Sequence, residues 1–346
     1  MAAKQGKADV QRVLVDLKTL PDISVLKDNV QAIVDRSSWW EVYGVDWVVV
    51  GVALLSLPCA LLLLAQFAVL PFVLGMFIYG CIHAVLSTKA GHSAAHGAVV
   101  RSPKWNKFWS HVFVELIGSF SANLGYSIHV IGHHTHTNII GLGDSSMWKA
   151  PFLPRYVYMF VAPLLVPALT PLFALFQFRE LGFRKAFASL LVITAGLAIN
   201  FSLLMHVSGF TLLGAVLVTF SSRAFLAIPY IHVNIFQHIG LTMFSQDSKP
   251  KRIYQMSTGV LNLPRNLVLD WCFGHSIISC HVEHHLFPKL SDNMCLKVKP
   301  VVRQFLLQHG LPYNEKTYWD RLKLFINKYE DLMVHAPPIT HFIGIQ

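Results

Sequence analysis

The sequence predicts an all-α integral membrane protein, in which four transmembrane helices form two hairpins and a helical cap lies in the cytosol. Two features of the composition support this fold class. The chain of 346 residues is 54% hydrophobic and only 13% charged, whereas soluble domains usually carry about 25% charged residues. Three stretches, residues 47–88, 156–178 and 186–222, contain no charged side chain. Each is long enough to cross a bilayer, which takes about 20 apolar residues in a helix.

The first third of the chain predicts a lead-in segment followed by a hairpin. Residues 1–45 are expected to form a cytosolic N-terminal helical segment, interrupted at Pro21. The apolar run over residues 48–87 is long enough for two spans, and its middle, residues 65–71, can hold a turn. Both ends of the run are therefore expected on the same side of the membrane. Residues 105–128 mix apolar and polar side chains, which favours a helix lying at the membrane interface.

The next apolar stretch, residues 156–178, is unusual in its prolines. It contains Pro163, Pro167 and Pro171. Proline has no N–H to donate and disfavours a straight helix. We therefore expect this stretch to be re-entrant or to lie at the interface, and not to cross the membrane.

The second hairpin is predicted over residues 186–207 and 210–230, which are separated only by the pair Ser208 and Gly209. A link this short favours two antiparallel neighbours. Residues 46–290 would then form the membrane domain that carries the histidine clusters described below. The more polar residues 291–346 are expected to form the C-terminal cytosolic cap.

The charge distribution argues against a nucleic-acid partner and for a lipid bilayer. Lysine and arginine outnumber aspartate and glutamate by 28 to 18, but they avoid the apolar runs. Cytoplasmic loops of membrane proteins carry such a basic excess. The five cysteines are scattered, odd in number and without CxxC spacing, so no disulfide framework is predicted.

Nine of the histidines fall into four short clusters. Residues three or four positions apart share one face of a helix, so each cluster can direct its imidazoles toward one point. Together the clusters predict a cage for one or two metal ions, held by the cytosolic ends of the helices and the cap. The clusters are GHSAAHGA (His92, His96), HVIGHHTHTN (His129, His133, His134), NIFQH (Asn234, His238) and HVEHHLFP (His281, His284, His285).

The number of histidines says more about the metal than their chemical type. Imidazole binds iron, zinc, copper and nickel alike. A zinc hydrolase usually presents three protein ligands and one open position, whereas nine histidines suit two ions. A cage without anionic ligands is compatible with oxygen activation by iron. His136 lies off the face of His129 and His133, and it is expected, like His275 and Asp270, to support the ligands without binding metal.

On these residues the chain resembles the membrane fatty acid desaturase family. The family's boxes HxxxH, HxxxHH and HxxHH match the first, second and fourth clusters in order, and HHTHTN is similar to the family's HHTYTN. LDWCFGH and EHHLFP resemble front-end acyl desaturases. The resemblance covers about residues 45–300. Asn234 and His238 are similar to a pair that stearoyl-CoA desaturases place near a diiron centre, which implies that Asn234 binds through a water.

The chain departs from the front-end pattern at three points. His281 begins the third box where glutamine is usual, and Ser93 stands where aspartate commonly follows the first histidine. The sequence also contains no HPGG haem motif. These departures leave the position of the double bond and the substrate headgroup open.

The resemblance implies an enzyme that uses two iron ions and O2 to remove two hydrogens from adjacent methylenes of an acyl chain. The nine clustered histidines, with Asn234 through water, would be the metal ligands. Cytochrome b5 and its NADH reductase would supply electrons, and the substrate would be an acyl-CoA or an acyl lipid. The implied location is the endoplasmic reticulum, as a multi-pass protein with its active site facing the cytosol.

Three alternatives share the same sequence features. A lipid hydroxylase would use the same cage, and a zinc-dependent membrane hydrolase would use zinc and no oxygen. A catalytically silent desaturase-like protein would bind lipid without reacting. The intact boxes argue against the silent protein, because such a copy need not keep all nine histidines.

Overall fold

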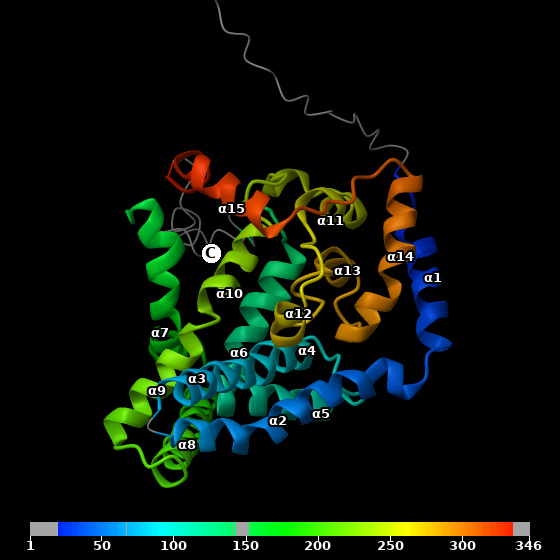
Figure 1. The fold of residues 1–346 in the computed structure, drawn as a ribbon. Helices are drawn as coiled ribbons and strands as arrows, with labels where there is room; N and C mark the ends of the chain where they lie inside the picture. Colours follow the sequence, from blue (N-terminus) through cyan, green and yellow to red (C-terminus); the bar gives the residue numbers. More distant parts are fainter. Residues whose placement is uncertain (1–19, 67, 141, 143–151, 335–346) are drawn as a thin grey trace, which may run out of the picture.

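The regular secondary structure is almost entirely helical. The computed structural model describes residues 20–66, 68–140, 142 and 152–334, and within these ranges the only extended pairings are two isolated β-bridges. Figure 1 shows α2, α3, α8 and α9 together at the bottom of the molecule, and α11, α13 and α14 in its upper part. The all-α fold class is confirmed for the described residues.

The first predicted hairpin is present. Helices α2 (Val45–Leu64) and α3 (Val69–His83) pack against each other and leave a turn at residues 65–68. The second helix continues through the π-helical turn η2 (Ala84–Ala90) into α4 (Gly91–Ala95). The first histidine cluster therefore lies at the end of a spanning helix, on the same side as the start of α2.

Glycines let helices of both hairpins approach their neighbours closely. A Cβ atom at Gly80 on α3 would overlap the backbone carbonyl of Ser222, and one at Gly196 would overlap that of Leu116. Small residues serve the same purpose at helix interfaces in membranes generally. The contact at Gly80 fixes the helix that carries the first histidine cluster against the second hairpin.

The region between the first two histidine clusters is a chain of short helices: α5 (Pro103–Ser110), η3 (His111–Ile117), α6 (Ala122–Gly125) and η4 (Tyr126–His133). The buried carboxylate of Glu115 holds this chain to the second hairpin, because it accepts hydrogen bonds from Ser189 Oγ (2.6 Å) and the Ala122 N–H (3.0 Å). None of these helices is long enough to span a bilayer.

The proline-rich stretch is a long helix. The π-helical turn η6 (Val157–Val161), α7 (Ala162–Gln177) and the 3₁₀ turn η7 (Phe178–Glu180) follow one another, with Pro167 and Pro171 inside α7. In Figure 1, α7 runs across the direction of α2 and α3 and not alongside them. By length and composition, however, residues 157–180 qualify as a span.

Five helices of the described chain, one more than predicted, are long and apolar enough to cross a membrane. They are Trp40–Leu64, Val69–Ala95, Val157–Glu180, Phe183–His206 and Leu212–Phe236. Large apolar side chains on these helices are exposed, including Leu55 (81%), Val69 (82%) and Leu213 (68%). Exposed apolar patches of this kind mark contact with lipid or protein. Several long apolar helices indicate a multi-pass membrane protein.

The second predicted hairpin is also present, and its second helix has a break. Helix α8 (Phe183–His206) is followed after a short turn by α9 (Leu212–Ala224), against which it packs. After residues 225–226 the chain continues as α10 (Ala227–Phe236). Asn234 thus lies on the last turns of the final span, and His238 follows just beyond it.

After the last long apolar helix the chain forms the short helices α11 (Arg252–Gly259), α12 (Leu267–Phe273) and α13 (His281–Leu286). The described part of the predicted C-terminal cap contains α14 (Asp292–Gln308), α15 (Tyr318–Asn327) and the π-helical turn η9 (Glu330–Val334). Helix α1 (Ile23–Asp35) packs along α14, and Leu26 and Val30 are buried there. The described part of the N-terminal segment therefore belongs to the same core as the C-terminal cap. Residues 1–19 and 335–346 of the predicted end segments lie outside the described residues.

Candidate metal centre

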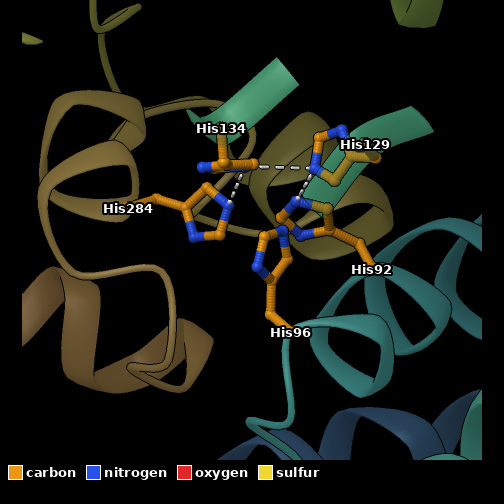
Figure 2. A group of neighbouring side chains, drawn as sticks. All are labelled: His92, His96, His129, His134 and His284. Atoms are coloured by element: carbon orange, nitrogen blue, oxygen red, sulfur yellow. Dashed lines mark hydrogen bonds between the residues drawn. The ribbon is translucent and has the colours of Figure 1, made fainter. Parts of the chain in front are cut away.

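The nine clustered histidines converge on two adjacent points. One group contains five histidines and the other four, and within each group one nitrogen of every ring lies within 4.8 Å of those of the other rings. Among the described residues, no carboxylate or thiol belongs to either group. Figure 2 shows the five rings of the larger group facing a common space. The five-histidine group is His92, His96, His129, His134 and His284, and the four-histidine group is His133, His238, His281 and His285.

Each histidine doublet is divided between the two groups. His133 and His284 belong to different groups from their chain neighbours His134 and His285. Adjacent residues on a helix point about 100° apart, since a turn contains 3.6 residues. The rings of His134 and His285 nevertheless stack, with centroids 4.1 Å apart, so the doublets place the two groups side by side.

The expectation that each cluster directs its rings to a single point is therefore wrong for the second and third boxes. The π-helical turn η4 explains the division in the second box. The N–H of His134 donates to the carbonyl of His129 five residues earlier, which is the hydrogen bond of a π-helix. His134, and not His133, consequently follows His129 into the five-histidine group.

The spacing of the inward nitrogens fits a bound ion. Nε2 of His129 lies 3.0 Å from Nε2 of His92 and 3.2 Å from Nε2 of His134. Nε2 of His238 lies 2.8 Å from Nε2 of His281. Two nitrogens that each bind a metal at about 2.1 Å, at right angles, are about 3 Å apart.

Two further buried nitrogens favour the same conclusion. Nε2 of His96 and Nε2 of His285 have no hydrogen-bond partner among the described residues. A buried polar atom without a partner costs free energy, and a metal ion at the centre of each group would satisfy both.

Burial keeps these imidazoles in the form that binds metal. The pKa values of His134, His238, His284 and His285 lie well below the usual value, because burial disfavours the charged ring and neighbouring histidines add repulsion. Burial also lowers the pKa of His281 to about 3, although its hydrogen bond to Ser276 acts in the opposite direction. Metal ions require the neutral ring.

The three predicted supporting residues lie outside both groups. His136 is half-buried, and its Nδ1 lies 3.3 Å from the Gly132 carbonyl. Nδ1 of His275 lies 3.4 Å from the buried carboxylate of Asp270, which also accepts a hydrogen bond from Ser279 Oγ at 2.9 Å. Asn234 donates to the Tyr230 carbonyl at 2.7 Å, and its binding through water stays a prediction.

Sequence reasoning missed a buried ion pair behind the centre. Lys89 Nζ lies 2.7 Å from Asp292, whose carboxylate also accepts the backbone N–H groups of His275 (2.9 Å) and Ser276 (2.7 Å). The Ser276 carbonyl in turn accepts the Nδ1–H of His281 at 2.9 Å. Burial alone would raise the pKa of Asp292, but Lys89 and these donors hold it below the usual value. No sequence motif indicates this pairing of residues 203 positions apart.

A second missed network lies within the third box. The carboxylate of Glu283, between the histidines of α13, is fully buried. It accepts hydrogen bonds from Tyr313 Oη (2.7 Å) and Asn262 Nδ2 (3.0 Å). Asn262 also accepts the N–H of Val282 at 2.8 Å. The buried glutamate of HVEHH was the available signal, because a buried carboxylate must find partners.

Arg252, the first residue of α11, bridges the second and third boxes. Its guanidinium donates to the backbone carbonyls of His134 (3.4 Å) and His285. The side chain is half-buried. It therefore contacts the backbone of one residue from each histidine group.

The helices and the two histidine groups together define a histidine-rich membrane protein with places for two metal ions. The chain belongs to the fatty acid desaturase family, whose sequence profile matches residues 35–317. The expected resemblance is thereby confirmed, and members of a desaturase family are oxidoreductases.

Individual relatives support a closer similarity within the family. We expected the chain to resemble fatty acid desaturase 6 most, and high identity to that protein is confirmed. The chain is 54% identical to fatty acid desaturase 6 of Bos taurus over 325 residues, which cover 93% of this chain and 94% of the relative. Identity to fatty acid desaturase 6 of Homo sapiens is 53% over 320 residues, or 91% and 89% of the two chains. The Delta(8)-fatty-acid desaturase 1 of Arabidopsis thaliana is 30% identical over 153 residues, covering 42% of this chain and 34% of that protein.

Proposed function

We propose that this protein is a membrane-bound fatty acyl desaturase that holds two iron ions in its two histidine groups. It would use O2 and external electrons to introduce a C=C double bond into a lipid acyl chain. The observation that carries the proposal is the convergence of nine imidazoles on two adjacent points, in a chain that belongs to the desaturase family.

The residues of the chain would bind and orient, while iron would supply the oxidising chemistry when bound. All nine histidines would act as ligands, and Asn234 would hold a water near the four-histidine group. No separate acid, base or nucleophile is needed. Three rings, those of His92, His129 and His133, are only half-buried, so the acyl chain would approach the centre on their side. The protein would hold two adjacent methylenes of the acyl chain in a fixed orientation there. Misplacement of the reacting atoms by about 1 Å can lower the rate about 100-fold.

The number and type of ligands favour this function over a zinc hydrolase. A catalytic zinc ion usually has three protein ligands, whereas the groups here contain five and four histidines. A lipid hydroxylase would need the same residues, so only the product separates it from a desaturase.

The proposed setting follows the family resemblance. Electrons would come from cytochrome b5 and its NADH reductase, and the substrate would be an acyl-CoA or an acyl lipid. The protein would lie in the endoplasmic reticulum with the histidine groups facing the cytosol. The basic excess outside the apolar helices supports that orientation.

The decisive experiment compares the wild type with two variants expressed in cells, with lipidomics as the measurement. Wild type should generate a new unsaturated acyl species, and His284→Ala, which removes a fully buried ring of the five-histidine group, should reduce it at least about 100-fold. His136→Ala is the control, because His136 lies in the second box, close in sequence to His133 and His134, and belongs to neither group.

Metal analysis of the purified wild type completes the test. About two irons per chain are expected, while zinc without iron would contradict the proposal. A hydroxylated product would assign the hydroxylase. Lipid profiles that do not differ between wild type and His284→Ala would count against desaturation.

A further inference from the structure

Thr137, four residues after His133 in HHTHTN, connects two rings of the four-histidine group. Its hydroxyl oxygen lies 2.7 Å from the backbone carbonyl of His133 and 3.1 Å from Nδ1 of His285. The side chain is fully buried. The second and third boxes therefore meet at one hydroxyl group.

The single proton of this hydroxyl determines the state of His285. A carbonyl oxygen only accepts, so the short contact with His133 requires the threonine proton. The hydroxyl oxygen must then accept from the ring, which places a proton on Nδ1 of His285. Nε2 is left with its lone pair, and this is the buried nitrogen without a partner among the described residues. Thr137 thus selects the tautomer in which Nε2 can bind a metal.

The neighbouring Asn138 supports a third ring of the same group. Its amide nitrogen lies 3.2 Å from the backbone carbonyl of His238, 3.1 Å from that of Thr242 and 2.9 Å from that of Gly259. Asn138 has a φ of 54°, a left-handed conformation that asparagine tolerates better than most residues. The Thr137 carbonyl itself accepts a hydrogen bond from Gln255 at 2.7 Å, so the pair is held from both sides.

The fourth ring has a similar support, because the Nδ1–H of His281 donates to Ser276. Nδ1 of His134 and Nδ1 of His284 in the five-histidine group, and Nδ1 of His238 in the four-histidine group, are buried without a hydrogen-bond partner in the described part of the chain. Thr137 and Ser276 thus give His285 and His281 of the four-histidine group outer hydrogen bonds that fix their tautomers, which these three rings lack.

We propose that Thr137 and Asn138 are positioning residues of the four-histidine group, which set the His285 tautomer and hold the His238 backbone so that both rings face one ion. This inference rests on the proposed function, since it requires that the groups bind metal. Outer partners of metal-bound histidines typically contribute about 10–100-fold to metal affinity. Removing the Thr137 hydroxyl should weaken the binding of the ion in the four-histidine group by that factor. The binding of the ion in the five-histidine group should not change.

The test measures iron content and affinity in purified protein, together with the Mössbauer spectrum, which distinguishes the two ions. Thr137→Val keeps the shape of the side chain and removes the hydroxyl, and Thr137→Ala removes it without a bulky replacement. Both should retain about one iron per chain after dialysis against a mild chelator, and the ion in the four-histidine group should bind about 10–100-fold more weakly. Thr137→Ser keeps the hydroxyl and should retain two irons with the wild-type spectrum.

Each contrary result has a distinct meaning. If Thr137→Val retains both irons with unchanged affinity and spectrum, the inference is wrong while the proposed function stands. Loss of both irons, or loss of folding in both Thr137→Val and Thr137→Ala, would also overturn it, because the hydroxyl would then support the whole centre or the fold. A wild-type protein that binds no metal would instead contradict the proposed function.

Discussion

Both histidine groups take rings from the second and third boxes, and they differ in the segment that completes them. The five-histidine group adds His92 and His96 from the end of the long apolar helix at residues 69–95. The four-histidine group adds His238, which lies just after the last long apolar helix. The register of a long helix positions His92 and His96, whereas a hydrogen bond from Asn138 holds the backbone carbonyl of His238. The comparison teaches that two similar sets of histidines can depend on different contacts.

A buried ion pair, Lys89–Asp292, connects the segments behind the two groups. Lys89 precedes His92 by one helical turn, while Asp292 holds the segment whose Ser276 carbonyl supports His281. A change at this pair should disturb both groups at once. The following variants test the comparison, beginning with the largest expected effect.

Asp292→Asn should destabilise the protein by about 3 kcal/mol, since removing one partner of a buried ion pair leaves an uncompensated charge. Lys89 would retain only Asp46, whose carboxylate oxygen lies 3.7 Å from its Nζ. Thermal unfolding in detergent measures the effect, and iron should be lost from both groups. Asp46→Asn is the matched control and should lower the free energy of unfolding by less. An equal loss of stability in the two variants would contradict the role of Asp292 in connecting the two groups.

Arg252→Gln should have the second largest effect, because the guanidinium donates to carbonyls of both groups. We expect both irons to bind about tenfold more weakly, which is about 1.4 kcal/mol. Iron titration of the purified variant measures this change. Lys251→Gln, at the adjacent exposed position, should leave both affinities unchanged, and a loss confined to one ion would mean that Arg252 serves one group only.

Tyr313→Phe should have the smallest effect. It removes one hydrogen bond to Glu283, and a typical hydrogen bond contributes about 1 kcal/mol. Because α13 carries ligands of both groups, the Mössbauer signals of both ions should broaden while the iron content stays near two. Tyr254→Phe, a half-buried tyrosine on neighbouring α11, is the control, and an equal effect on stability from both variants would argue against a specific role for Tyr313.

Much of the fold could be predicted, because the length of an apolar run depends only on residues that are neighbours in the sequence. The turns at residues 65–68 and 207–211 follow from apolar runs too long for one span, and bilayer thickness sets that length. Residues 157–180 were harder to interpret, because three prolines argue against a helix by local preference. The structure forms a helix there, packed against α9 and α10, so tertiary contacts outweigh the local preference.

The histidines that converge could also be predicted, but their division between two groups could not. His129 and His133 have the spacing of a common α-helical face, and only the π-helical turn η4 sends them to different groups. π-Helical turns are rare and often occur at functional sites. Sequence periodicity does not indicate them.

By itself the sequence determined the helical hairpins, the nine histidines and their place beside the apolar runs, because these depend on residues near one another in the chain. The tertiary structure alone decided which rings share a centre and which other side chains hold those rings in place. Thr137 meets His285 across 148 positions and Lys89 meets Asp292 across 203. Contacts over such separations depend on how the helices pack, and local sequence patterns do not predict that packing.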